Sequence, residues 1–246
     1  MSEIIHGEAL ATMRDLPTGS FDALITDPPY CSGGTTSVDR TTRTAKDKYV
    51  SSDSKSGLAL PDFPDQRDQR SFTLWCTLWL GEALRLVRPS GQALVFTDWR
   101  QLPAMSDALQ AAGWRWRGIV VWAKPGARPQ PGFANGAEYI LWASNGTLDR
   151  DHRPPCLPGV YSIVRPTGKQ RMHITAKPVE LMRNLVRTVP AGGRILDPFA
   201  GSGTTGVAAL HEGRRFLGIE GTAGYTEIAR DRLTATRAEL DADADA

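Results

Sequence analysis

The chain has 246 residues, 41% of them hydrophobic, and a formal net charge of only +2. This length fits one large domain, and the small charge excludes a protein that coats nucleic acid through bulk electrostatics. The sequence contains no run of about 18 apolar residues, so no membrane span is predicted, and the first residues do not resemble a secretory leader. Cys31, Cys76 and Cys156 form neither a disulfide framework nor a zinc spacing. We therefore expect a cytoplasmic protein with no metal and no membrane partner.

The first part of the chain alternates strands and helices around one irregular segment, residues 31–70. This segment is polar and has few large apolar residues, so we interpret it as an insert with a function of its own. The expected order is a strand at 4–5, a helix at 9–16, a buried strand at 22–26, the insert, a helix at 71–87 ended by Pro89-Ser90-Gly91, and a strand at 93–97.

The second part continues this alternation around a shorter irregular segment, residues 145–172. The expected order is a helix at 102–112, strands at 116–122 and 139–143, the irregular segment, a helix at 178–189, a strand at 194–196, a helix at 205–211, a strand at 216–219, a helix at 227–240 and a frayed tail at 241–246. Strands that alternate with helices predict an α/β domain, 1–246, with a mainly parallel sheet covered on both faces.

The segment Asp197-Pro198-Phe199-Ala200-Gly201-Ser202-Gly203-Thr204-Thr205 follows a predicted buried strand and opens a helix. Gly201 and Gly203 allow backbone N–H groups to approach a ligand, and the helix start offers further donors. Glu220, at the end of the next strand, can accept hydrogen bonds from both ribose hydroxyls, so an adenosine-type cofactor is expected. Residues 201–206 also match Gly-x-Gly-x-x-Gly, so NAD remains an alternative, as does a turn without a ligand.

A second loop, Asp27-Pro28-Pro29-Tyr30, follows the buried strand at 22–26. Consecutive prolines fix the backbone and remove two N–H donors. The Asp27 carboxylate and the Pro28 carbonyl can then accept both hydrogens of an exocyclic amine, which frees its lone pair to attack a sulfonium methyl group. Tyr30 can stack on a base that has been flipped out of a duplex. Alone, the motif also fits a simple turn; the two loops together predict methyl transfer from S-adenosylmethionine (SAM) to a nucleobase.

These segments resemble the SAM-dependent DNA amino-methyltransferases, specifically the β-class, in which the catalytic motif precedes the cofactor motif. The resemblance implies a Rossmann-like fold with a seven-stranded, mostly parallel sheet in which one strand is antiparallel. This sequence departs from the family pattern at Ile174, where the family usually has proline, and at Glu8, where the family often has aspartate. The segments that carry the resemblance are residues 5–30, 121–125, 138–142, 173–182, 197–205 and 216–220.

The resemblance assigns the catalytic role to one loop and cofactor binding to several segments. The catalytic residues are Asp27, Pro28, Pro29 and Tyr30. The expected cofactor-binding residues are Glu8, Asp27, Thr175, Lys177, Asp197, Phe199, Ala200, Gly201, Ser202, Gly203, Thr204, Thr205 and Glu220.

The family's sequence reader usually precedes the cofactor helix, which here makes residues 145–172 a small target-recognition region and 31–70 a clamping loop. Candidate contacts to double-stranded DNA in the reader are Arg150, Arg153, Arg165, Lys169 and Arg171, and in the clamp Arg40, Arg43, Lys46 and Lys48. Solvated loops are the alternative for both sets. So short a reader predicts a short recognition site or a homodimer, and a restriction endonuclease is a further candidate partner.

The favoured activity is methylation of adenine N6 in DNA, with S-adenosylhomocysteine as the product. Aspartate as the first residue of the catalytic motif favours adenine, because cytosine N4 enzymes of the family more often have serine there. Cytosine N4 is the first alternative; RNA or protein-amide methylation, an NAD enzyme and a binding module are further ones. Pro155-Cys156 matches the nucleophile of ring-carbon cytosine methylation, but no other motif supports it, so we interpret Cys156 as structural.

Overall fold

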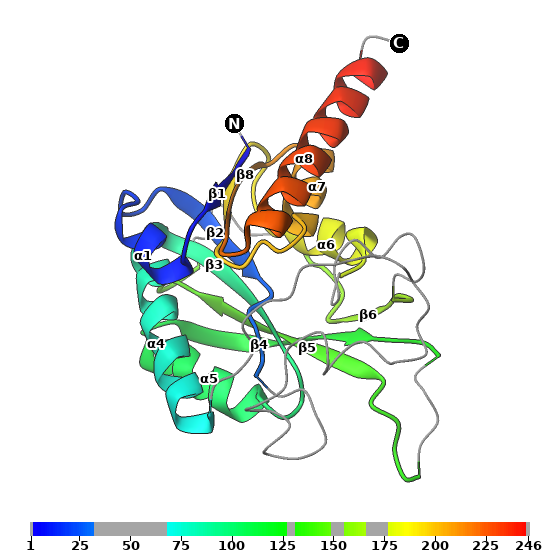
Figure 1. Ribbon diagram of the computed structural model, residues 1–246. Coiled ribbons are helices and arrows are strands. Elements are labelled where there is room, and N and C mark those ends of the chain that lie inside the picture. The colour runs from blue at the N-terminus through cyan, green and yellow to red at the C-terminus, as the bar shows by residue number, and fades with distance from the viewer. Residues whose placement is uncertain (1, 32–67, 127–130, 149–154, 166–176, 245–246) are drawn as a thin grey trace.

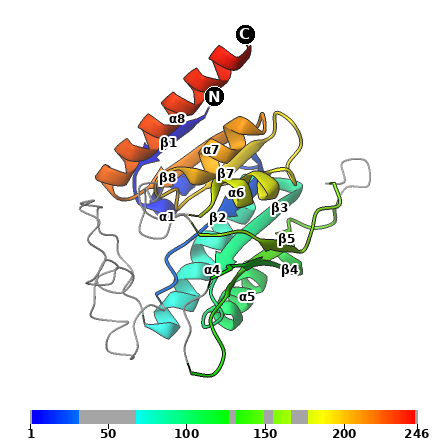
Figure 2. The same ribbon diagram turned by 90° about the vertical axis from the view of Figure 1, so that its right-hand side faces the viewer.

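In the described part of the chain, eight strands form one sheet between two layers of helices (Figures 1 and 2). The computed structural model describes residues 2–31, 68–126, 131–148, 155–165 and 177–244. The strands are β1 (Glu3–His6), β2 (Phe21–Thr26), β3 (Val87–Thr97), β4 (Arg115–Ala123), β5 (Ala137–Ser144), β6 (Val160–Ser162), β7 (Arg194–Asp197) and β8 (Arg215–Glu220).

The helices cover the sheet in two groups, and the strands alternate between them. On β2, Leu24 packs into one core and Ile25 into the other; on β3, Val95 and Phe96 divide in the same way. This alternation follows from the strand geometry, in which successive side chains point to opposite faces. One face carries α1 (Ala9–Arg14), α4 (Gln69–Leu86) and α5 (Leu102–Ala111); the other carries α6 (Val179–Val186), α7 (Thr204–His211) and α8 (Ala223–Ala244).

The strand order is β1-β8-β7-β2-β3-β5-β4-β6. β5 is antiparallel to both of its neighbours, and every other pairing among the described strands is parallel. This confirms the predicted fold class, with one strand more than expected. From the central pair of β2 and β7, the chain continues outward to β3 on one side and to β8 on the other. This pair is therefore a topological switch point, where open α/β sheets bind ligands beyond the carboxyl ends of their strands.

The predicted end of the helix before residues 89–91 is confirmed, since α4 ends at Leu86, but β3 begins at Val87 and runs through these residues, whereas a start at 93 was expected. The pairing with β2 is irregular there: Phe21 faces Val87, whereas Ala23 faces Gln92. A bulge of this kind accommodates Pro89 within a strand. A Cβ on Gly91 would lie 2.7 Å from the carbonyl oxygen of Asp22, so the close approach of the two backbones requires glycine.

Other parts of the chain also differ from the prediction. The region 145–172 contains β6, which pairs with β4 and adds the eighth strand. The supposed tail continues α8 as far as Ala244, because its alanines favour a helix. α4 begins at Gln69, inside the proposed insert, with Asp68 as its N-cap; residues 32–67 lie outside the described part. No helix of the described part is long and apolar enough to cross a membrane.

Candidate active site

The two loops of interest begin beside each other at the switch point. Thr26 ends β2 and Asp197 ends β7, and the Thr26 hydroxyl donates a buried hydrogen bond of 2.7 Å to Asp197 Oδ1. The Asp27-Pro28-Pro29-Tyr30 loop therefore starts one residue after a direct contact with the start of the other loop. This arrangement is the juxtaposition that a two-substrate reaction between the loops requires.

Hydrogen bonds to the Asp197 side chain stabilise the loop that follows it. The Asp197 carboxylate is buried and also accepts hydrogen bonds from Thr205 Oγ1 at 2.6 Å and from the Phe199 N–H at 3.1 Å. Burial raises the pKa of Asp197 to about 6, although the hydrogen bonds from Thr205 and Thr26 oppose this increase. The side chain thus closes the loop between β7 and α7, while a direct contact with a cofactor stays a prediction.

Glu220 ends β8 and presents acceptors beside this loop. Its Oε2 accepts a hydrogen bond of 2.9 Å from the Gly201 N–H, and its Oε1 accepts one of 2.8 Å from the Thr222 N–H. A carboxylate oxygen has two lone pairs, so each oxygen keeps one for a further donor. Two spare acceptors on one rigid carboxylate suit the paired hydroxyls of a ribose.

The glycines of the loop serve both conformation and packing. Gly203 caps α7 with a φ of +78°, which a side chain disfavours. A Cβ on Gly206, the third glycine of the formal dinucleotide pattern, would lie 2.7 Å from the Phe216 ring and from Leu233 Cδ2. Gly206 is thus required where α7 meets β8 and α8, and this packing does not depend on which adenosine cofactor is bound.

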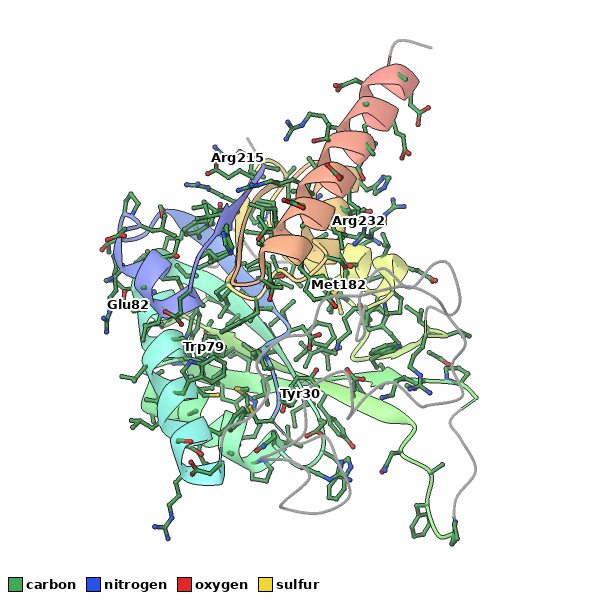
Figure 3. All side chains as sticks on the ribbon, in the orientation of Figure 1. Tyr30, Trp79, Glu82, Met182, Arg215 and Arg232 are labelled. Atoms are coloured by element: carbon green, nitrogen blue, oxygen red, sulfur yellow. The ribbon has the colours of Figure 1, made fainter. Side chains whose placement is uncertain are left out.

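Arg232 of α8, labelled in Figure 3, holds the far side of the loop. Its Nη1 donates to the Ser202 carbonyl at 2.6 Å, to Ser202 Oγ at 3.1 Å and to Thr204 Oγ1 at 3.2 Å. Burial lowers the pKa of Arg232, which nevertheless remains the cation in this contact. Ser202 and Thr204 are consequently buried toward α8, and their proposed role in cofactor binding depends on their backbone groups.

Phe199 is half-buried and has its ring edge-on to two tryptophans of α4. The ring centroids are 5.4 Å from Trp75 and 5.1 Å from Trp79. Figure 3 shows Trp79 pointing from α4 toward the sheet. The α4 helix therefore supports the cofactor loop from the opposite face to α8.

The catalytic loop has a closely bonded carboxylate at its start. Asp27 Oδ1 accepts a hydrogen bond of 2.6 Å from the Tyr30 hydroxyl, and Asp27 Oδ2 lies 2.6 Å from Lys177 Nζ. Pro28 is buried and Pro29 half-buried. The Lys177 ammonium also lies 5.4 Å from the centre of the Tyr30 ring. The structure thus fixes both Asp27 and Tyr30, and each Asp27 oxygen retains a lone pair for a substrate amine.

Two residues for which no role was predicted complete this cluster. Glu138 of β5 lies 3.0 Å from Lys177 Nζ through Oε2 and 3.0 Å from Lys124 Nζ through Oε1. The Tyr30 hydroxyl is 3.4 Å from the same Oε2. Asp27, Tyr30, Lys124, Glu138 and Lys177 therefore form one network, which we call the catalytic network.

The ionisation of the network follows from burial and from neighbouring charges. Burial raises the pKa of Asp27, and the Lys177 ammonium opposes this shift. Burial also acts to raise the pKa of Glu138, but Lys177 and Lys124 outweigh it and hold this pKa at about 2. For Lys177, the nearby carboxylates overcome desolvation and raise the pKa. Burial raises the pKa of Tyr30 well above its usual value, so its hydroxyl stays protonated and donates.

The structure changes the expected position of some cofactor residues. Lys177 lies in the catalytic network, with its ammonium on Asp27 and Glu138. Glu8 is exposed, and its carboxylate caps α1 by accepting a hydrogen bond of 2.7 Å from the Ala11 N–H. Ala200 is buried behind β8, to which its N–H donates at Ile219. Thr175 lies outside the described residues.

The candidate DNA contacts lie mostly outside the described part of the chain. Of these residues only Arg165 is described, and it is exposed shortly after β6. The others that fall outside are Arg40, Arg43, Lys46, Lys48, Arg150, Arg153, Lys169 and Arg171.

A sequence signal for Lys124 and Glu138 does exist. Each stands next to an end of the apolar segments that become β4 and β5, and an antiparallel pairing of these segments brings the two ends together. Trp122 faces Glu138 in this pairing. Within the described residues, no group of three or more histidine, cysteine, aspartate or glutamate side chains is arranged to hold a metal ion.

The three-layer fold and the two loops at its switch point define a methyltransferase of the Rossmann-like class. More specifically, residues 21–153 and 156–231 match the family model of the DNA methylases, N6_N4_Mtase. The chain belongs to this family.

Its relatives extend over nearly the whole chain. The type II methyltransferase M.HinfI of Haemophilus influenzae is 27% identical over 95% of this chain and 68% of its own length. The putative methylase YubD of Escherichia coli is 29% identical over 96% of this chain and 92% of its own length. Among solved structures, the M1.HpyAVI–SAM complex has a TM-score of 0.67 at 25% identity and covers 95% of this chain and 99% of its own. The cytosine-N4-specific PvuII DNA methyltransferase shares the fold, with a TM-score of 0.70 at 15% identity, and the match covers 94% of this chain and 86% of its own.

Proposed function

We propose that this protein transfers the methyl group of SAM to the exocyclic N6 of adenine in double-stranded DNA, in the cytoplasm of a prokaryote. The observation that carries this proposal is the hydrogen bond between Thr26 and Asp197. It brings the amine-accepting Asp27 and the adenosine-type loop to the same point of the sheet. Family membership supports DNA as the substrate.

The residues of the cofactor loop fit SAM. This cofactor supplies a methyl group made electrophilic by its sulfonium. Glu220 holds the ribose hydroxyls through the lone pairs left by Gly201 and Thr222. The N–H groups at the start of α7 face an anionic group, because a helix N-terminus favours negative charge. M1.HpyAVI and TTHA0409 of Thermus thermophilus, which share this fold, have been solved with SAM bound.

The catalytic loop acts on the amine. Asp27 and the Pro28 carbonyl accept its two hydrogens, so that the nitrogen lone pair is withdrawn from the ring and directed at the methyl group. Tyr30 has its hydroxyl bound to Asp27 and keeps a ring face for the extruded base. Flipping the base out of the duplex costs a few kcal/mol, and contacts of this kind offset that cost.

Cytosine N4 is the second candidate, because it is also an amine conjugated to a ring and the same acceptors fit it. Aspartate at position 27 favours adenine. The test is to incubate the purified protein with unmethylated duplex DNA and methyl-labelled SAM, and to identify the methylated nucleoside by mass spectrometry. N6-methyldeoxyadenosine is expected, and N4-methyldeoxycytidine would overturn the choice of base. Transfer to RNA or protein but not to DNA would overturn the substrate class.

The cofactor has its own test. SAM is expected to raise the Tm of the protein, since a ligand that binds only the folded state stabilises it, whereas NAD is expected to leave the Tm unchanged. A stabilisation by NAD alone would support the dinucleotide alternative that the glycine pattern leaves open.

The proposal extends to DNA recognition by the two inserts. We assign base reading to 145–172, of which Arg165 is exposed, and clamping to 31–70. A homodimer that completes the clamp and a restriction endonuclease with the same target are further parts of the proposal. A monomeric mass in gel filtration at assay concentration would overturn the dimer.

A further inference from the structure

Two carboxylates of the catalytic network share one buried ammonium. Lys177 Nζ lies 2.6 Å from Asp27 Oδ2 and 3.0 Å from Glu138 Oε2, and only 6% of its side chain is exposed. Under the proposed function, Asp27 receives hydrogens from an amine whose nitrogen becomes positive as the methyl group arrives. A cation bound to Asp27 alone would compete with that amine and repel the developing charge.

Glu138 is built to hold its position while Asp27 changes partners. Its Oε1 is held by Lys124 at 3.0 Å, which leaves Oε2 directed at Lys177. The side chain belongs to β5, in the interior of the sheet, and its backbone position is fixed by the pairing with Trp122 on β4. Glu138 is thus a rigid counter-ion within reach of Lys177.

We propose that Glu138 is a positioning residue for methyl transfer: it is the second counter-ion of Lys177 and takes over the lysine charge when Asp27 turns to the target amine. The inference rests on the proposed function. The nitrogen lone pair forms the N–C bond while the S–C bond breaks and its electron pair goes to sulfur. The proton that the amine then loses goes to a carboxylate oxygen of Asp27.

The charges of the network explain why Glu138 is needed. With Asp27 ionised, two carboxylates balance the ammonium groups of Lys124 and Lys177. When Asp27 takes the proton, one uncompensated positive charge is left. Without the Glu138 carboxylate there would be two such charges in a buried site, which is far less favourable. Glu138 therefore lowers the free-energy cost of protonating Asp27.

Other ionisable groups face this network from the neighbouring strands. Asp197 on β7 interacts with Asp27, and Asp98, just after β3, interacts with Tyr30. Both are carboxyl groups and neither pairs with Lys177 in the described contacts. They add negative charge near Asp27 but do not replace the contact that Glu138 makes.

The test is Glu138→Gln, which removes the charge and keeps the size. We expect kcat for DNA methylation to fall roughly 10- to 100-fold, less than loss of a direct proton acceptor, while the Kd for SAM stays the same. The acid limb of the kcat–pH profile is expected to move to lower pH, because the pKa of Asp27 falls when a neighbouring negative charge is removed. Lys177→Met should move this limb to higher pH.

Opposite shifts of the two variants distinguish an electrostatic role from a structural one. In the double variant Lys177→Met/Glu138→Gln, the loss of kcat should be smaller than the product of the single losses, because each single variant leaves one member of the Lys177–Glu138 pair without the other, whereas the double variant removes both charges. An unchanged kcat in Glu138→Gln, or a loss with no movement of the acid limb, would overturn the proposal.

A matched control is available on α4. Glu82 also pairs with a cation, Arg85 at 2.9 Å, and Figure 3 shows it on the outer side of that helix. Glu82→Gln should leave kcat and the pH profile unchanged. Equal Tm values for Glu138→Gln and the wild type show that the variant is folded.

A measurement without DNA separates this inference from the proposed function. Titration of the Asp27 carboxyl carbon by ¹³C NMR in the isolated protein should give a lower pKa in Glu138→Gln and a higher pKa in Lys177→Met. If the wild type methylates no DNA but these shifts occur, the proposed function fails and the coupling stands. If DNA is methylated and the pKa of Asp27 does not move, the inference alone fails.

Discussion

Thr26 donates its hydroxyl hydrogen to the buried carboxylate of Asp197 at 2.7 Å, across 171 positions of sequence. The two residues end adjacent parallel strands, so this bond fixes the distance between the loops that follow them. Holding two reacting groups in a defined geometry supplies much of the rate in reactions without a covalent enzyme intermediate.

Asp27→Asn tests the catalytic assignment. The amide retains the size of the side chain but presents one acceptor in place of two, so it holds the target amine poorly. We expect kcat to fall by at least roughly 100-fold, as for loss of a preorganised polar group, with the Kd for SAM nearly unchanged. Isothermal titration calorimetry and a methylation assay check the two quantities. Activity close to that of the wild type would contradict the role of Asp27.

Asp197→Asn tests the consequence of the raised pKa. The pKa of Asp197 in the folded protein, about 6, exceeds the ordinary value of 3.8. Protonation of Asp197 therefore adds to the free energy of unfolding, and this stabilisation is complete below about pH 4 and is lost as pH rises through 6. The stability of the wild type relative to Asp197→Asn should therefore decrease by roughly 1 kcal/mol from pH 5 to pH 7. Urea unfolding at several pH values measures this difference, and a constant difference would contradict the assignment.

Gly206→Ala tests the packing beneath the cofactor loop. The added methyl group would lie 2.7 Å from Phe216 and Leu233, and relieving this contact should cost about 1–3 kcal/mol of unfolding free energy. Gly81→Ala is the matched control, because in the interior of α4 a Cβ there would meet no described atom within 4 Å apart from the helix backbone and its chain neighbours. Alanine in a helix should stabilise the protein by up to about 1 kcal/mol. Thermal unfolding should show opposite signs for the two variants.

Arg232→Met tests whether α8 holds the cofactor loop. The variant loses three hydrogen bonds to Ser202 and Thr204 and keeps much of the apolar volume. We expect the Kd for SAM to rise about tenfold, equivalent to about 1.4 kcal/mol, with kcat at saturating SAM unchanged. Arg237→Met on the same helix, which loses a hydrogen bond to the Ser2 carbonyl and none to the loop after β7 among the described contacts, should leave the Kd unaltered. Equal Kd values for both variants would contradict the role of Arg232.

Much of the fold follows from local sequence signals. The runs of consecutive apolar residues that include Leu24-Ile25 and Val95-Phe96 are visible in the sequence, and because successive strand residues point to opposite faces, such runs predict strands covered on both sides. β6 was missed because three residues among prolines and glycines carry too little periodicity, and only the neighbouring β4 stabilises them as a strand. The bulge near Gly91 was missed for a similar reason, since the approach of β2 determines it.

The site could be predicted in part. The loops at Asp27 and Asp197 were found because strand ends beside a switch point are recognisable from residue types and spacing. The position of Lys177 was not, since nothing in the sequence shows that its side chain reaches one carboxylate in the loop after β2 and another on β5. Glu138 and Lys124 stand near the ends of two apolar segments in the sequence, but only the antiparallel pairing of β4 with β5 brings them together.

The pairing of β1 with β8 has a consequence for how the protein is made. Ile4 faces Gly218 and His6 faces Glu220, so β1 cannot pair with β8 until all the residues between them have been translated. Such distant pairings slow folding and leave an edge exposed in the nascent chain. The loop after Thr26 likewise meets the loop that begins at Asp197 only after the segment between them has been made, so the two halves of the candidate site come together late in synthesis.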